Sequence, residues 1–189
     1  MLLETIRCEN GEADNLIYHQ RRMEYSLEKL GWNAIYDLES IIIPPKSGLY
    51  RCRFLYDANH YAIEFHPYVP KKISSLRLIQ ADTLEYSLKS ADRESLNALF
   101  AQRGSSDDVL IVKNNLLCDT TIANIALLID NQWLTPSTPL LEGTIRARLL
   151  DEGFLNTAFL TPKDIEKAAK IAIMNAMVGF VEVENGIIS

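Results

Sequence analysis

The sequence predicts an α+β protein with two unequal lobes, on the basis of three observations. Two alternating apolar runs, at residues 49–56 and 61–65, are typical of a β-hairpin. Apolar residues recur with helical spacing over residues 16–30. Pro67 and Pro70 then mark a linker, so we expect a domain boundary there.

The smaller lobe is expected to span residues 1–70 and to begin with a strand at residues 2–8. Asn10-Gly11 follows this strand, and Asn-Gly is a strong turn signal. The helix is expected to end at Gly31, because glycine readily adopts the left-handed conformation that closes a helix. The predicted hairpin completes this lobe.

The larger lobe is expected to span residues 71–189 and to mix strands with helices. A helix is expected to start at Thr161-Pro162, because threonine can cap a helix and Asp164 occupies the capping-box position. The other expected helices cover residues 90–102 and 144–150. The expected strands cover residues 73–79, 109–112, 122–129, 133–134, 171–174 and 180–183.

Composition restricts the classes of function. The chain has 189 residues, 48% of them hydrophobic, which is enough to bury a sizeable core. Its 25 acidic and 19 basic residues give a net charge of −6, which argues against a nucleic-acid-coating surface. No apolar run approaches the roughly 20 residues of a membrane span, and the first residues lack the features of a signal peptide. Cys8, Cys52 and Cys118 are widely spaced and odd in number, which is typical of reduced thiols. We therefore expect a soluble, cytoplasmic protein that binds neither nucleic acid nor membrane.

Two basic groups are candidates for chemistry in the first half of the chain. His19 and Arg22 are three residues apart on a predicted helix, so both could reach one anion. The same spacing also fits a solvated basic patch. Lys89 precedes a predicted helix and could be a nucleophilic amine, although most lysines only carry surface charge.

Two further candidates lie in the second half. Asp119 and Asn124 are polar residues among apolar neighbours and need partners if they are buried. Asp119 could pair with a protonated ring nitrogen, or it could cap a turn. Gly143 opens a predicted helix, a position where backbone N–H groups can bind phosphate, although many ordinary helices also follow a glycine. No metal site is expected, because histidines and cysteines do not occur at metal-binding spacing.

Six segments, taken in order, resemble the class IV (fold-type IV) family of pyridoxal-phosphate enzymes, and most closely its aminodeoxychorismate lyases. The resemblance covers most of the chain. The segments are Leu3-Glu4-Thr5-Ile6-Arg7 with Asn10-Gly11, His19-x-x-Arg22-Met23, Leu88-Lys89-Ser90 with Arg93, Asp119-Thr120-Thr121-Ile122-Ala123-Asn124-Ile125, Trp133-Leu134-Thr135-Pro136 and Leu141-Glu142-Gly143-Thr144-Ile145-Arg146.

The resemblance implies a fold, a cofactor and a set of site residues. The fold would be the two-lobed fold-type IV scaffold, whose larger lobe has a strand-rich core and carries the Schiff-base lysine, and the cofactor would be pyridoxal 5'-phosphate. Lys89 would be the catalytic residue that holds it, and Asp119 would keep its ring nitrogen protonated. Arg22 and the N–H groups of Thr144 and Ile145 would hold the phosphate. Arg7 would face the substrate and attract a carboxylate.

Within the family, residues 143–150 and 175–180 are most similar to the lyase branch. This similarity implies conversion of 4-amino-4-deoxychorismate to 4-aminobenzoate and pyruvate, a step of folate synthesis, by a homodimer. The alternatives are a class IV aminotransferase, acting on branched-chain or D-amino acids, and a catalytically inactive member of the family.

The sequence departs from the family pattern at two places. Asp119 stands where the family usually has the longer glutamate. Only Met1 and Leu2 precede Leu3, whereas family members usually have a further strand there. The resemblance therefore implies a shortened small lobe with altered substrate handling.

Overall fold

The chain folds into two compact units in the computed structural model, which describes residues 1–184, 186 and 187. The first unit comprises Met1–Pro70 together with Leu88–Asp92, and the second comprises Lys71–Ser87 and the described residues from Arg93 onward.

Lys89 therefore belongs to the first unit, which corrects the expectation that the larger lobe carries it. The physical reason is backbone pairing with the first strand. The Leu3 N–H donates to the Lys89 carbonyl over 2.9 Å, and Leu2 forms an antiparallel bridge with Ser90.

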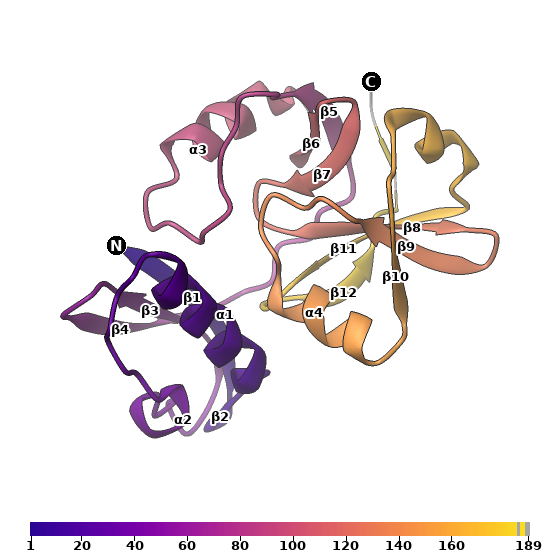
Figure 1. Ribbon diagram of the computed structural model, residues 1–189. Helices are drawn as coiled ribbons and strands as arrows, with labels where there is room; N and C mark the ends of the chain where they lie inside the picture. Colours follow the sequence, from indigo (N-terminus) through magenta and orange to yellow (C-terminus); the bar gives the residue numbers. More distant parts are fainter. Residues whose placement is uncertain (185, 188–189) are drawn as a thin grey trace. The chain divides into compact units, whose positions relative to one another are not determined.

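The first unit contains an antiparallel sheet in the order β2-β1-β3-β4, visible in Figure 1. The hairpin predicted from the alternating runs is present, and the Asp57 carboxylate closes its turn by accepting the N–H groups of Asn59 and His60. The turn after the first strand uses Asn10 and Gly11, both at positive φ. The strands are β1 (Leu2–Glu9), β2 (Glu12–Ala13), β3 (Leu49–Tyr56) and β4 (Tyr61–Pro67).

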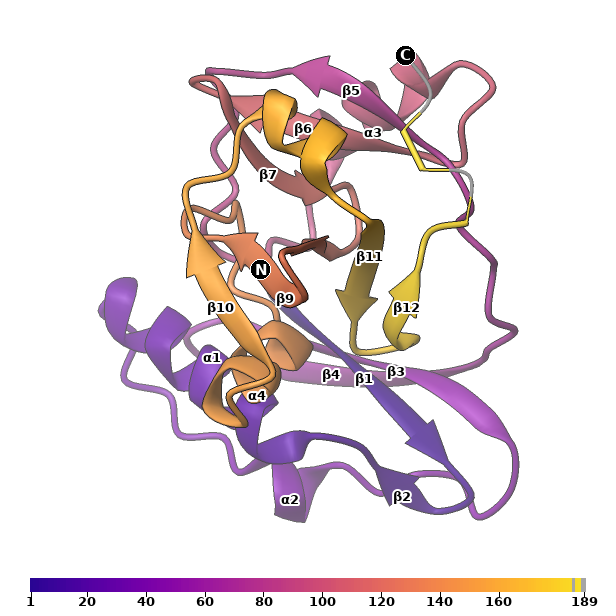
Figure 2. The same ribbon diagram turned by 90° about the vertical axis from the view of Figure 1, so that its right-hand side faces the viewer.

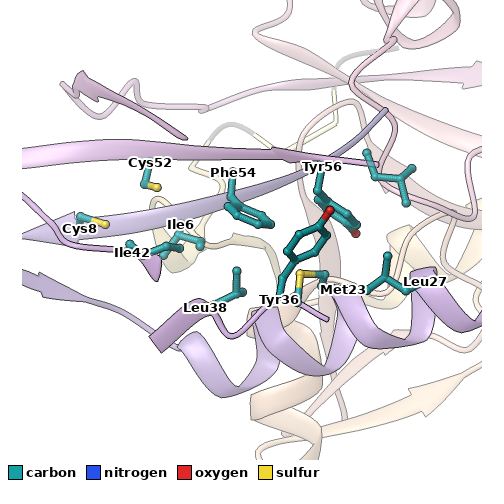
Figure 3. Close-up of a cluster of buried hydrophobic side chains, with 11 residues drawn as sticks. Ile6, Cys8, Met23, Leu27, Tyr36, Leu38, Ile42, Cys52, Phe54 and Tyr56 are labelled. Atoms are coloured by element: carbon teal, nitrogen blue, oxygen red, sulfur yellow. The ribbon is translucent and has the colours of Figure 1, made fainter. Parts of the chain in front are cut away.

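Helix α1 (Leu16–Lys29) covers one face of this sheet, and the four-residue α2 (Leu38–Ile41) follows it. Met23 and Leu27 of α1 point toward Phe54 and Tyr56 of the sheet, as Figure 3 shows. Burial of these apolar side chains holds the helix on the strands. The first unit thus has its own core.

The second unit is built on a mixed sheet whose main path runs β10-β9-β8-β7-β6-β5. Strand β11 pairs with β8 and with β12, and Figure 2 shows the β11–β12 hairpin. The pairs β5–β6 and β9–β10 are parallel. The strands are β5 (Leu76–Gln80), β6 (Asp108–Lys113), β7 (Leu116–Thr120), β8 (Asn124–Ile129), β9 (Gln132–Pro136), β10 (Leu155–Ala158), β11 (Lys170–Asn175) and β12 (Gly179–Glu182).

Strand β6 shows why this sheet is stable. Its residues 109–112 are buried on both faces: Leu110 and Val112 join the main core, while Val109 and Ile111 pack under Leu96 of a helix. A continuous apolar run is typical of a strand covered on both sides.

The helical segments of the second unit lie near their predicted positions. The capping box at Thr161 is present, with its N–H donating to the Asp164 carboxylate over 2.9 Å, but the segment that follows is a 3-10 helix. The helix expected over residues 90–102 starts four residues late, because Ser90 is held by its bridge to Leu2. The segments are α3 (Glu94–Phe100), η1 (Ala101–Arg103), α4 (Thr144–Asp151) and η2 (Pro162–Lys167).

No helix among the described residues is long and apolar enough to cross a membrane.

Candidate active site

Glu4 is the centre of a buried polar network in the first unit. It lies on β1, on the same face as Ile6 and Cys8, and has no exposed surface. Its Oε1 accepts Arg22 Nε over 3.0 Å, and its Oε2 accepts both Arg22 Nη2 and, over 2.6 Å, His19 Nδ1. A single carboxylate therefore binds two side chains of α1.

Electrostatics fix the charge states in this network. Burial alone would raise the pKa of Glu4, but the Arg22 charge and the interaction with His19 outweigh it and lower the pKa to about 2. Burial lowers the pKa of His19, and the charges of Arg22 and Lys89 act in the same direction, although Glu4 opposes them. Glu4 is therefore ionised at neutral pH, and a neutral His19 donates from Nδ1.

The helical spacing of His19 and Arg22 predicted that both could reach one anion, and in the structure that anion is the Glu4 carboxylate. Sequence reasoning treated Glu4 only as part of a family motif. The signal that could have found it is alternation: Leu2, Ile6 and Cys8 face the core, so Glu4 must face it too and needs buried partners.

Lys89 is half-buried in the first unit. Its carbonyl is fixed by the Leu3 N–H, and Leu3 precedes Glu4 on β1. Lys89 is also near enough for its charge to act on His19. Strand β1 of the first unit therefore contacts both the predicted catalytic lysine, through Leu3, and the predicted phosphate-binding Arg22, through Glu4.

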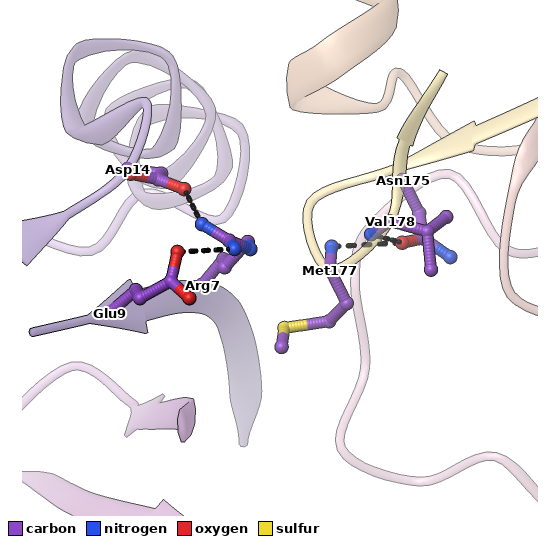
Figure 4. Close-up of polar contacts among 6 residues, drawn as sticks. All are labelled: Arg7, Glu9, Asp14, Asn175, Met177 and Val178. Atoms are coloured by element: carbon purple, nitrogen blue, oxygen red, sulfur yellow. Dashed lines mark hydrogen bonds and ion pairs between the residues drawn. The ribbon is translucent and has the colours of Figure 1, made fainter. Parts of the chain in front are cut away.

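Arg7 does not join this network. Strand alternation places its side chain on the opposite face of the sheet from Glu4. Its Nη2 pairs with Glu9 at 2.6 Å and its Nη1 with Asp14 at 2.7 Å, as Figure 4 shows. These hydrogen bonds, that with Asp14 first, raise the pKa of Arg7. A substrate carboxylate at Arg7 must therefore compete with two carboxylates of the chain itself.

Asp119 is the buried carboxylate of the second unit. It lies on β7, and it accepts Asn124 Nδ2 at Oδ1 over 2.8 Å and the Leu141 N–H at Oδ2 over 2.9 Å. Burial raises its pKa to about 6, although these hydrogen bonds and the Arg146 charge oppose the shift. Burial therefore disfavours the ionised form of Asp119, and a cation beside the carboxylate would stabilise that form.

Asn124 links Asp119 to the start of α4. Besides its bond to Asp119, its Nδ2 donates to the Leu141 carbonyl over 2.8 Å. The carboxamide lies so close to Gly143 that a Cβ built there would be 2.0 Å from Asn124 Oδ1. Gly143 is the N-cap of α4, so a residue with a side chain could not occupy this position unless Asn124 moved.

The first turn of α4 contains the two predicted phosphate contacts, Thr144 and Ile145, both buried. The N–H groups of a first helical turn lie outside the intrahelical hydrogen bonds and favour an anion. Arg146 follows, and its Nη2 donates to the Pro136 carbonyl over 2.9 Å, which ties α4 to the end of β9. The second unit thus brings Asp119, Thr144 and Ile145 together through Asn124.

The segment of residues 175–180, which resembled the lyase branch, forms the turn between β11 and β12. Asn175 Oδ1 accepts the N–H groups of Met177 and Val178 over 2.9 and 3.1 Å, as Figure 4 shows. Its Nδ2 donates to the Ile122 carbonyl over 3.3 Å, and Gly179 completes the turn at positive φ. In this structure the segment has a structural role.

The described residues contain no group of three or more His, Cys, Asp or Glu side chains that could hold a metal ion.

Comparison with known proteins identifies the family. The family model for class IV aminotransferases matches residues 54–185. An uncharacterised protein of Haemophilus influenzae is 40% identical over 184 residues, which cover 94% of this chain and 98% of the relative. The chain belongs to the class IV aminotransferase family.

Two solved structures share the fold. A Haemophilus somnus protein, provisionally assigned as a 4-amino-4-deoxychorismate lyase, is 36% identical and superposes with a TM-score of 0.89, over 94% of this chain and 96% of its own. A Mesorhizobium loti protein, provisionally assigned as an amino-acid aminotransferase, is 23% identical with a TM-score of 0.82 over 99% of both chains. The fold-type IV scaffold implied by the sequence is confirmed.

Proposed function

We propose that this chain is a pyridoxal-phosphate-dependent lyase that converts 4-amino-4-deoxychorismate to 4-aminobenzoate and pyruvate. The cofactor assignment rests on Asp119, a buried carboxylate beside the start of α4 that accepts hydrogen bonds from Asn124 and from the Leu141 N–H. The lyase assignment is supported by the likeness to the Haemophilus somnus protein, over most of both chains.

The chemistry of these residues fits pyridoxal phosphate, the cofactor of this family. A carboxylate has about four acceptor positions, and the hydrogen bonds from Asn124, Leu141 and Leu140 to Asp119 leave capacity for a protonated ring nitrogen. A helix N-terminus and a guanidinium are both suited to a phosphate. A Mycobacterium tuberculosis protein of the same fold, 17% identical, has been solved in its pyridoxal-phosphate-bound form.

Each residue has a distinct proposed role. Pyridoxal phosphate, when bound, supplies an electron sink next to the carbon that bears the substrate amine. Lys89 Nζ would hold the cofactor and, once the substrate amine has taken its place, would remove the proton from that carbon. Asp119 keeps the ring nitrogen protonated. Arg22 and the N–H groups of Thr144 and Ile145 bind the phosphate.

An aminotransferase is the second candidate, because the matching family model is that of the class IV aminotransferases. Lys89 Nζ would then carry the proton that amino transfer requires, and no pyruvate would be released. The residues that hold the cofactor would be the same, so a measurement of products must separate the two reactions. A member of the family without activity is the third possibility.

The test begins with the absorbance of the purified protein. A yellow protein whose absorbance borohydride bleaches, and whose Lys89→Ala variant lacks the absorbance, supports cofactor binding at Lys89. A colourless protein that cannot be reconstituted contradicts both enzyme assignments. Pyruvate released from 4-amino-4-deoxychorismate supports the lyase, whereas glutamate-dependent amino transfer supports the aminotransferase.

We further propose that the protein is a cytoplasmic homodimer that acts in folate synthesis. Light scattering of the purified protein measures its mass directly, and a monomer at micromolar concentration contradicts the dimer. Growth of a deletion strain tests the pathway, because 4-aminobenzoate should restore growth if the chain supplies it.

A further inference from the structure

We propose that Glu4 is a positioning residue for phosphate binding: it holds the Arg22 guanidinium in the orientation that receives the phosphate monoester of the cofactor. This inference rests on the proposed function, in which Arg22 binds that phosphate. Glu4 itself does not contact the ligand in this proposal. It acts through Arg22.

The geometry of the pair fixes the guanidinium in a plane. Glu4 accepts hydrogen bonds from both Nε and Nη2 of Arg22, one at each carboxylate oxygen. Two parallel bonds between planar groups restrict rotation of the guanidinium, which a single contact would allow. The arginine side chain has many rotamers, so holding it in one before the ligand arrives removes an entropic cost from binding.

The carboxylate is itself held in place. Glu4 is fully buried, and its Oε2 also accepts His19 Nδ1 over 2.6 Å. His19 and Arg22 are one turn apart on α1, so the three groups also fix α1 against β1. Glu4 therefore cannot turn toward solvent and release Arg22 without breaking both contacts.

Strand β1 connects this pair to Lys89. The Leu3 N–H holds the Lys89 backbone, and the next residue, Glu4, holds the Arg22 side chain. Pyridoxal phosphate carries its phosphate arm and its reactive carbon on neighbouring positions of one ring, so the two groups that bind them must lie within a limited distance of each other. Leu3 and Glu4 are adjacent on β1, so this strand sets the distance between Lys89, which would bind the reactive carbon, and Arg22, which would bind the phosphate.

Removal of the carboxylate has two opposing effects on phosphate binding. It removes a negative charge that repels the phosphate, which would tighten binding. It also removes the buried carboxylate that holds the Arg22 guanidinium, a group that is only 11% exposed. Without the two hydrogen bonds from Glu4 the guanidinium can rotate out of its present plane, so we expect the second effect to dominate.

The test compares dissociation constants for pyridoxal phosphate and for pyridoxal, which lacks the phosphate. In Glu4→Gln we expect the constant for pyridoxal phosphate to rise about tenfold or more, because a hydrogen bond between a charged group and its ligand contributes about this factor. The dissociation constant for pyridoxal should stay within a factor of about three of the wild-type value. Pyridoxal has no phosphate, so a change that acts only on phosphate binding does not alter its affinity. Glu64→Gln is the matched control: Glu64 also pairs with an arginine, Arg53, at 2.6 Å in the same sheet, but at the surface.

A double variant makes the test independent of folding defects. Glu4→Gln combined with Arg22→Gln removes both members of the ion pair, and it should bind pyridoxal phosphate no more weakly than Arg22→Gln alone. Equal losses for pyridoxal phosphate and pyridoxal in Glu4→Gln overturn the inference, as does tighter binding of pyridoxal phosphate by Glu4→Gln. Weaker binding of pyridoxal phosphate by the double variant than by Arg22→Gln alone overturns it as well. If Arg22→Gln loses affinity and Glu4→Gln does not, the inference fails and the proposed function stands. If wild type binds no pyridoxal phosphate, or Arg22→Gln binds it normally, the phosphate-binding role of Arg22 in the proposed function fails, and the inference fails with it.

Discussion

Asn124 donates to the Asp119 carboxylate over 2.8 Å while its own Oδ1 occupies the space where a side chain on Gly143 would begin. One carboxamide therefore determines both the orientation of the predicted ring-nitrogen partner and the path of the chain into α4. This contact connects Asp119 with the N-cap of α4, whose first turn contains the other two proposed cofactor contacts of the second unit, Thr144 and Ile145.

Gly143→Ala is expected to destabilise the protein and weaken cofactor binding. The new Cβ would lie 2.0 Å from Asn124 Oδ1, and Asn124 is held by two hydrogen bonds. Overpacking of this kind costs about 1–3 kcal/mol, measurable by denaturant unfolding. Asn124→Ala makes room for the methyl group, so Gly143→Ala should cost little more in that background. An equal loss in both backgrounds would show that the clash is not the cause.

Asp119 is expected to make the folded protein less stable as pH rises. Its pKa is about 6 in the folded protein, against an ordinary value of 3.8. A group whose pKa is raised by folding stabilises the folded state fully below the lower value, and this contribution disappears as pH rises through the higher one. The shift of about two pH units corresponds to about 3 kcal/mol.

The measurement is the unfolding free energy of cofactor-free wild type minus that of Asp119→Asn, from about pH 4 to pH 7. The subtraction removes the titration of other groups. The difference should decrease over this range, and a constant difference would contradict the assigned pKa.

Glu4 is expected to have the opposite pH dependence. Its pKa falls from 4.5 to about 2 on folding, so its contribution to stability is present above pH 4.5 and is lost as pH falls toward 2. The full loss amounts to about 3 kcal/mol. Acid unfolding of wild type, compared with the Glu4→Gln, Arg22→Gln double variant, measures this contribution. If both proteins lose stability equally between about pH 5 and pH 3, Glu4 does not titrate as described.

Arg7→Gln is expected to raise KM for 4-amino-4-deoxychorismate with little change in kcat or in pyridoxal-phosphate affinity. The reason is that the family resemblance implies a role for Arg7 in attracting a substrate carboxylate, while its side chain faces away from the Glu4 network. Its pairs with Glu9 and Asp14 are partly exposed, so stability should change by less than about 1 kcal/mol. Arg53→Gln is the control, because Arg53 also pairs with a carboxylate on this sheet. If both variants have the wild-type KM, Arg7 has no role in substrate binding.

Local sequence signals predicted most of the elements, because their causes lie within a few residues. The β3–β4 hairpin is fixed by alternation and by the Asp57 turn, and the capping box at Thr161 involves residues three positions apart. Strand β7 was missed although it pairs with the neighbouring β6, because Asp119 and Thr120 interrupt its apolar pattern. Other failures involve pairing between distant segments. Strand β10 pairs in parallel with β9, and Ser90 is held by Leu2, so neither the presence of β10 nor the start of α3 could be inferred locally.

The sequence by itself determined the family and the candidate residues, because these depend on residue types in a fixed order. Tertiary structure decided what each candidate contacts. Arg22 pairs with Glu4 across 18 positions of the chain, and Asp119 accepts the Leu141 N–H across 22. Such contacts form only when separate elements pack together, and burial then fixes the charge and orientation of each group. The spacing of residues along the chain does not show which of them become buried.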